Sequence, residues 1–173
     1  MSKSSNFFSL YPLFQPSELR VVAGSGSCSI LKGFSTKTRT SISGATAINS
    51  LLPNVADINA PTNWYTVQDE YPDYFQFYAS DMIVYPVLEN ESTSTYMRCQ
   101  VYSGGIMLAD ITFRGGGIGG TIAGSRIMGR YFEDCFFKDD LTIRFARQGN
   151  LTSPNSVISF GDYKIIKYSA ISI

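Results

Sequence analysis

TYMRCQVY, residues 95–102, is the stretch of this sequence that decides the fold. Its apolar residues Met97, Cys99 and Val101 stand at every second position and alternate with polar ones. Successive side chains of a β-strand point to opposite faces of a sheet, so a period of two predicts a strand with one buried face.

The same period recurs toward the C-terminus, where Leu141, Ile143 and Phe145 alternate with more polar neighbours. Further β-rich runs, separated by Gly, Pro, Asn, Asp and Ser, occupy residues 28–34, 64–67, 74–78, 82–88, 106–113, 156–160 and 163–173. Short strands at even spacing, without long helical patterns between them, predict an all-β fold, an antiparallel sandwich or barrel of about eight to ten strands.

One short helix is expected over residues 43–52. Pro53 follows this run and stops it, because a proline cannot continue a helix. The apolar residues predicted to share one face of the helix are Ala47, Ile48, Leu51 and Leu52.

The composition describes one globular domain and excludes many enzyme designs. The chain has 173 residues, with 14 Lys plus Arg, 14 Asp plus Glu and no His. Without His, Ser-His-Asp and Cys-His catalysis, His-ligated zinc and the commonest general base at neutral pH are all absent. We therefore predict a protein that is not an enzyme and needs no cofactor.

Charge is segregated along the chain although it sums to zero. Residues 1–50 carry five basic residues and one acidic residue, whereas residues 51–96 carry seven acidic and no basic ones. Opposite patches on one body can steer copies of it together, although solvated loops of one sign would give the same pattern.

The first twenty residues differ from the rest. Phe7, Phe8, Tyr11 and Phe14 lie among Ser and Pro without sustained alternation. We interpret residues 1–20 as an arm that buries these rings on its own domain or on a neighbour, and residues 21–173 as the folded body.

The N-terminus lacks the charged start and apolar stretch of a secretory signal, and no run of eighteen apolar residues occurs. We expect a protein made in the cytoplasm, with no membrane partner. Cys28, Cys99 and Cys135 match neither a disulfide framework nor a zinc site, so we interpret them as reduced, buried small residues.

Two patterns resemble ligand sites. Gly115, Gly117 and Gly120 satisfy GxGxxG after a strand, but no helix of sufficient length follows to receive a pyrophosphate. We expect instead a loop where glycines allow backbones to approach closely, at a ligand, a symmetry axis or a subunit contact. Acidic residues cluster at 69–73 and 133–140, without the spacing of a Ca²⁺-binding loop, and no metal is predicted.

Aromatic residues gather at positions 64–65 and 71–78. Trp64, Tyr65 and Tyr71 form a candidate platform for stacking on sugar rings. The acidic surroundings disfavour nucleic acid at this place. A lectin-like carbohydrate-binding sandwich is therefore the alternative interpretation, beside packing in the core or an interface.

Two segments resemble small single-jelly-roll viral coat proteins. They are EYPDYFQFYASDMIVYPV, residues 70–87, in which an aromatic-rich turn introduces an alternating strand, and GDYKIIKYSAISI, residues 161–173, which is similar to the last strand of that family. The resemblance implies a single jelly roll of about eight strands, many copies of which form the closed shell of a virion. The chain departs from the Arg-rich N-terminal arm frequent in such coats, since residues 1–19 contain Lys3 as their one basic residue.

We therefore predict a self-assembling structural subunit. Its partners are further copies of itself and, as a second partner, packaged nucleic acid. The candidate subunit contacts are Phe7, Phe8, Tyr11, Phe14, Asp69, Glu70 and Asp73. The candidate contacts to nucleic acid or to acidic neighbours are Arg20, Lys32, Lys37 and Arg39.

Overall fold

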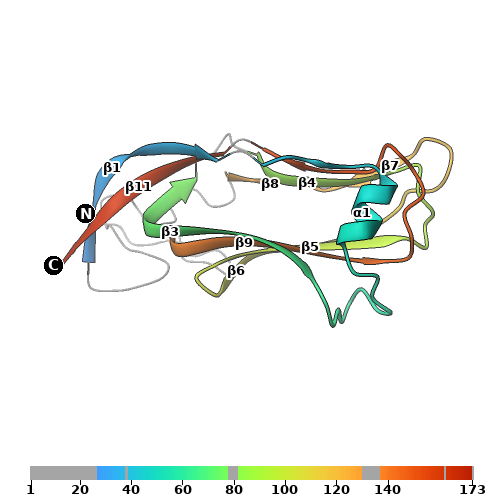
Figure 1. Cartoon of the computed structure of the whole chain (residues 1–173), viewed down its shortest axis with the longest axis horizontal. Coiled ribbons are helices and arrows are strands. Elements are labelled where there is room, and N and C mark those ends of the chain that lie inside the picture. Colours follow the sequence, from blue (N-terminus) through green and yellow to red (C-terminus); the bar gives the residue numbers. More distant parts are fainter. Residues whose placement is uncertain (1–26, 38, 78–81, 130–136, 162, 173) are drawn as a thin grey trace, which may run out of the picture.

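The chain forms two antiparallel sheets packed face to face (Figure 1). The computed structural model describes residues 27–37, 39–77, 82–129, 137–161 and 163–172. Its elements are β1 (Ser27–Lys37), β2 (Ile42–Ser43), α1 (Ala45–Leu51), β3 (Tyr65–Phe77), β4 (Met82–Glu89), β5 (Tyr96–Ser103), β6 (Ile106–Arg114), β7 (Ile122–Gly124), β8 (Ile127–Met128), β9 (Phe137–Gln148), β10 (Val157–Phe160) and β11 (Tyr163–Ser172).

The strand order is that of a jelly roll. One sheet runs β2-β10-β4-β7, with β8 also paired to β4, and the other runs β1-β11-β3-β9-β5-β6. Taking β1 with β2, β7 with β8 and β10 with β11 as single strand paths gives eight paths, and the first and last paths lie side by side. The predicted all-β sandwich of about eight strands with one short helix is confirmed.

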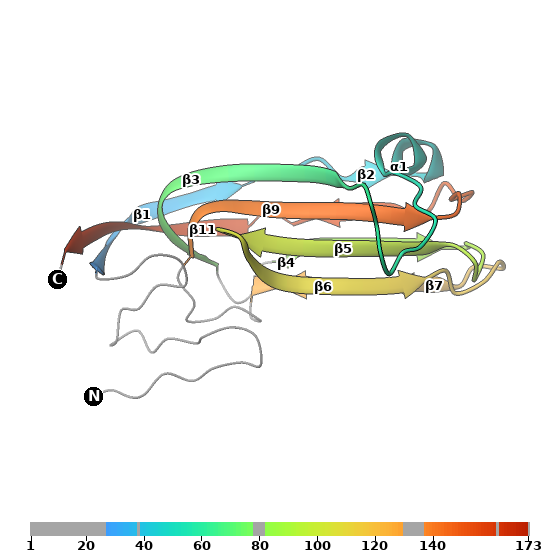
Figure 2. The same cartoon turned by 90° about the horizontal axis from the view of Figure 1, so that it is seen from below.

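Figure 2 shows β3, β9, β5 and β6 lying beside one another in that order. At one end of the sandwich, β1 and β11 run together and curve away from the other strands (Figure 1). The helix α1 lies at the opposite end.

The core fills the space between the sheets. Met97, Cys99 and Val101 of β5 are fully buried, as the period of two predicts. The alternating residues of β9 are buried with them, and Ile83 and Leu88 of β4 lie in the same hydrophobic cluster. Burial of such side chains contributes about 1.5–3 kcal/mol each to folding.

The helix occupies the expected place but buries a different face. Ile48 and Leu52 are buried, whereas Leu51 is 42% exposed. The chain leaves the helix at Leu52, which has extended backbone angles (φ −84°, ψ 130°). Leu52 therefore reaches the core from beyond the helix end, and the prediction that Leu51 shares the buried face was wrong.

The largest departure from the predicted strands is in β3. Separate strands were expected at residues 64–67 and 74–78, but β3 is continuous over 13 residues. Its pairing with β9 shifts register between Tyr71 and Phe75, and Pro72 stands within that shift. A proline cannot donate to a ladder, so a bulge is the place where a strand accommodates one.

Candidate functional site

Four connections meet at the α1 end of the sandwich. We call these connections, together with Ile122 at the start of β7, the loop cluster, defined as residues 44–54, 90–95, 115–122 and 149–156. Asn49 and Leu151 exchange two hydrogen bonds across it, of 2.8 and 3.0 Å. The backbone N–H of Gly149 donates to Oδ1 of Asn54 at 2.9 Å. These contacts tie the α1 connection to the β9–β10 connection.

A buried carboxylate joins three of these loops. Glu91 is fully buried and accepts hydrogen bonds from the backbone N–H groups of Thr152 (2.8 Å) and Ser153 (2.9 Å). The hydroxyl groups of Thr152 and Ser156 also donate to it, at 3.1 and 2.7 Å. Its own carbonyl oxygen accepts the N–H of Gly117 at 2.9 Å. Hydrogen bonds to an ionised group are stronger than neutral ones, so Glu91 holds the loops in fixed positions.

A buried guanidinium group caps α1. Arg147 donates from Nε to the carbonyl of Leu52 (3.0 Å) and from the NH2 nitrogen to the carbonyl of Asn49 (3.1 Å). Its NH1 nitrogen donates to the carbonyl of Gly149 and to Oδ1 of Asn150. The last carbonyl groups of a helix lack partners within the helix and carry partial negative charge, which a cation stabilises. Burial lowers the pKa of Arg147.

The Gly-rich stretch forms a turn that exposes apolar side chains. Gly117, Gly119 and Gly120 have positive φ angles, which side chains with a Cβ atom rarely adopt. Oδ1 of Asn90 accepts the N–H groups of Gly119 (2.6 Å) and Gly120 (3.2 Å), which fixes the tip. Ile118 at the tip is 74% exposed and Ile122 is 61% exposed. Since β7 follows the glycines rather than a helix, the turn lacks the structure that binds a dinucleotide.

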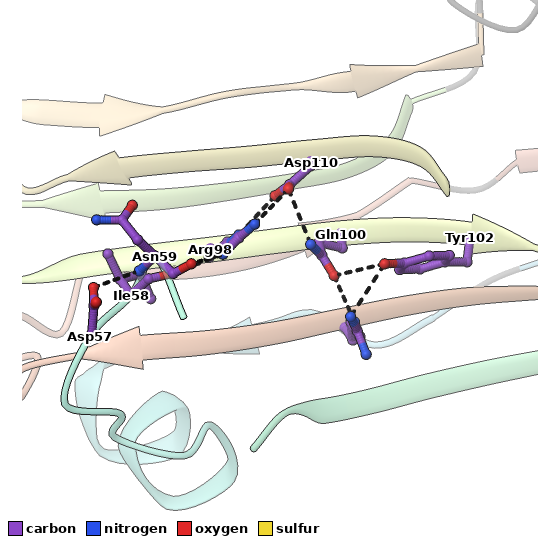
Figure 3. Close-up of polar contacts among 8 residues, drawn as sticks. Asp57, Ile58, Asn59, Arg98, Gln100, Tyr102 and Asp110 are labelled. Carbon is purple, nitrogen blue, oxygen red and sulfur yellow. Dashed lines mark hydrogen bonds and ion pairs between the residues drawn. The ribbon is translucent and has the colours of Figure 1, made fainter. Parts of the chain in front are cut away.

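A second polar assembly covers the outer face of the sheet β3-β9-β5-β6 (Figure 3). Arg98 and Asp110 form two hydrogen bonds, of 2.9 and 2.7 Å. Gln100 donates from Nε2 to Asp110 at 3.1 Å and accepts the Tyr102 hydroxyl at 3.2 Å. Nε of Arg144 donates to the same Gln100 oxygen at 2.8 Å. We call these five residues the outer-face network.

The network also holds a loop. NH1 of Arg98 donates to the carbonyl oxygens of Ile58 and Asn59 (Figure 3). The guanidinium group of Arg144 lies 4.2 Å from the ring centre of Trp64, and that of Arg98 lies 5.8 Å from it. These contacts anchor residues 52–64 on the outer face of the sheet.

The hydrogen bond from Arg98 is the main cause that holds the pKa of Asp110 below its ordinary value, and a bond from Gln100 adds to it. The same pair raises the pKa of Arg98. Burial raises the pKa of the Cys99 thiol on the opposite face of β5. Cys99 is reduced and buried, as predicted. The side chain of Cys28, and the whole of Cys135, lie outside the described part.

The structure describes only some of the candidate subunit contacts. Asp69 forms an ion pair of 2.5 Å with Arg39 of the same chain, so these two predicted contact residues meet within one subunit. Glu70 stands opposite Asp140 in the β3–β9 ladder, and Asp73 lies within the register shift of β3. The candidates Phe7, Phe8, Tyr11, Phe14 and Arg20 lie outside the described residues. The remaining basic candidates, Lys32 and Lys37, belong to β1.

The candidate sugar platform is not assembled as predicted. Tyr65 packs against the core and stacks on Phe145, with ring centres 6.4 Å apart. Trp64 instead packs with Val55 and Ile58 in a separate cluster under the 52–64 loop. Tyr65 faces the core between the sheets, whereas Trp64, which precedes β3, lies beside the guanidinium groups of Arg144 and Arg98, so these two rings do not form one surface. Tyr71 lies in β3, next to the register shift.

Sequence reasoning missed Glu91 and Arg147, and it took Gln100 for a residue of the exposed face. Gln100 is in fact buried beneath its polar neighbours.

No protein-family model and no curated protein sequence matches this chain. Among the described residues, no group of three or more His, Cys, Asp or Glu is placed to hold a metal ion. In the same part of the chain, none of the helices has the length and apolar character needed to cross a membrane.

Proposed function

We propose that this chain is a structural subunit of the coat-protein type, which associates with further copies of itself through the loop cluster. The observation that carries the proposal is a well-anchored turn that exposes Ile118 and Ile122. A jelly roll by itself hosts many functions, so the proposal rests on this surface and not on the fold.

Anchoring matters because association must overcome the entropy of ordering both surfaces. The turn is already ordered by Asn90 and by the bond from Gly117 to the carbonyl of Glu91. A pre-ordered surface loses little further freedom on binding. Full burial of an isoleucine side chain contributes about 1.5–3 kcal/mol, so contacts at Ile118 and Ile122, repeated in every subunit, favour a closed assembly.

The charged residues contribute less to this proposal than their segregation in the sequence indicates. Arg39 and Asp69 are paired within the chain, and Arg98 is paired with Asp110. A charge that already has a partner gains little from a second subunit. Apolar contacts at the loop cluster are therefore the proposed main contribution to association.

Size-exclusion chromatography with light scattering, followed by negative-stain microscopy, tests the proposal. The purified chain should form assemblies of defined size as its concentration is raised. The double variant Ile118→Ser/Ile122→Ser should remain a folded monomer, because both positions are exposed. Thr112→Ser, on the exposed face of β6, is the matched control and should assemble like the unaltered chain.

A chain that stays a 19.1 kDa monomer in every buffer and at every concentration tested would overturn the proposal. If the double variant assembled at the same concentration as the unaltered chain, the loop cluster would be excluded as the contact between subunits.

A further inference from the structure

An open cavity lies on the outer face of the sheet, next to the outer-face network, and its lining combines polar groups with a larger apolar surface. Its volume is about 350 Å³. Three strands and the β5–β6 turn contribute its lining residues, which are Thr66, Tyr102, Gly105, Asp140, Thr142 and Arg144. In the ladders, Thr66 stands opposite Arg144, and Arg144 stands opposite Gln100. The rigid sheet therefore fixes the spacing of the groups on the cavity floor.

Arg144 lines one side of the cavity, and its contacts fix the orientation of its guanidinium group. Its Nε donates to Gln100 and its NH2 nitrogen donates to the Tyr102 hydroxyl at 3.3 Å. Its guanidinium group also lies over the rings of Trp64 and Tyr102. Gln100 is oriented in turn by its bond to Asp110. A guanidinium group has five N–H donors, so three remain for a ligand after these two bonds.

Asp140 lines another side of the cavity, and hydrogen bonds fix the orientation of its carboxylate. Its carboxylate accepts the N–H of Gly104 (2.6 Å), Nε2 of Gln68 (2.7 Å) and the hydroxyl of Thr142 (3.3 Å). A carboxylate has about four acceptor positions, so about one remains. Because the hydroxyl proton of Thr142 is directed to Asp140, its oxygen is left to accept a hydrogen bond. Thr66 adds a hydroxyl that can donate or accept.

We propose that this cavity binds an uncharged pyranose unit of a glycan. The arginine needs ligand oxygens that accept, while Asp140 and Thr142 need ligand groups that donate. Neighbouring sugar hydroxyl groups supply both on adjacent atoms, and the tyrosine ring offers an apolar surface beside them. The cavity volume suits a ligand of this size, since ligand pockets begin at about 300 Å³.

Charge distinguishes an uncharged sugar from an acidic one. The lining carries one positive group, Arg144, and one negative group, Asp140, which balance. A sugar carboxylate would satisfy the arginine but would bring no proton for Asp140 and would meet repulsion from it.

This site differs from the platform expected from the sequence, because none of Trp64, Tyr65 and Tyr71 belongs to its lining. The proposal does not depend on self-association, since the cavity lies within one subunit and away from the loop cluster. Failure of one proposal therefore leaves the other standing.

The proposal is tested with methyl glycosides of glucose, galactose and mannose. Ligand-detected NMR and calorimetry measure whether each of them binds. A single sugar ring should bind with a Kd on the order of 1 mM, given the affinity available per ligand atom. Asp140→Asn should weaken binding about tenfold by removing a charged acceptor, and Thr66→Ala should weaken it severalfold. Thr66 is exposed, so Thr66→Ala keeps the test valid if Asp140→Asn fails to fold.

Thr112→Ala is the matched control, a threonine on the exposed face of β6 outside the cavity lining, and should bind like the unaltered chain. Absence of binding to all three glycosides would overturn the proposal. Equal binding by Thr66→Ala and the unaltered chain would also overturn it. Binding of methyl glucuronide in preference to the neutral sugars would overturn the assignment of an uncharged ligand.

Discussion

Ser156 donates its hydroxyl proton to the carboxylate of Glu91 over 2.7 Å, and both residues are completely buried. The bond joins the β4–β5 connection to the start of β10. A carboxylate without solvent is tolerated only where several donors replace water, and Thr152 and Ser153 supply the others. Glu91 is therefore the centre of the loop cluster.

Glu91→Gln should lower the free energy of unfolding by about 2–3 kcal/mol, because the amide nitrogen that replaces one oxygen would face buried donors. Urea unfolding followed by tryptophan fluorescence measures the change. Glu89→Gln, on a half-buried residue two positions earlier, is the matched control and should change stability by under about 0.5 kcal/mol. Equal effects of the two substitutions would contradict the role given to Glu91.

Arg147→Met should destabilise the chain by about 2–4 kcal/mol, because it removes the donors to the carbonyl groups of Leu52, Asn49 and Gly149. Hydrogen exchange locates the effect, and the amide of Leu52, which bonds to the carbonyl of Ile48, should exchange faster. The control is Arg114→Met, on an exposed arginine at the end of β6. Unchanged protection at Leu52 would argue against capping by Arg147.

Neighbouring glycines of the Gly-rich stretch should respond differently to alanine. A Cβ atom at position 115 would lie 2.3 Å from the carbonyl oxygen of Ser92, whereas one at position 116 would meet the side chain of Thr121 at 3.1 Å. Gly115→Ala must displace backbone and should cost about 3 kcal/mol, while Gly116→Ala should cost under about 1 kcal/mol. Thermal unfolding of the two variants compares them, and equal midpoints would contradict the close approach at Gly115.

The core was predictable because burial itself produces the pattern that the sequence displays. Met97, Cys99 and Val101 stand at alternate positions since one face of β5 is buried. The same argument failed for β3, where Pro72 interrupts the alternation and only the pairing with β9 shows that the strand continues. Neither local pattern nor turn residues carry that information.

The loop cluster was less predictable, because the residue type alone does not distinguish a buried charged side chain from an exposed one. The partners of Glu91 are backbone and hydroxyl groups far along the chain, which no local pattern reveals. Arg147 left one signal, because it stands in phase with Leu141, Ile143 and Phe145 on the buried face of β9. A basic residue that continues the alternation of a buried strand face is expected to be buried, with hydrogen-bond acceptors around its charged group. The cavity is lined by residues from three strands. The sequence does not give the register of these strands, so it could not show that the residues lie together.

The ion pair between Arg98 and Asp110 should make stability depend on pH in the acid range. The pKa of Asp110 is lowered in the folded chain, so its contribution is complete above the ordinary pKa of an aspartate and is lost as pH falls through the lowered value. At pH 7, Asp110→Asn should cost about 0.5–1 kcal/mol, because the pair is partly exposed. This difference should shrink as pH falls below about 4. Urea unfolding from pH 7 to pH 2 measures it, and in an Arg98→Gln background the pH dependence should become smaller, because Gln100 and Arg144 still lower the pKa of Asp110. A difference that stays constant across this range would show that the ionised carboxylate of Asp110 is not what stabilises the pair.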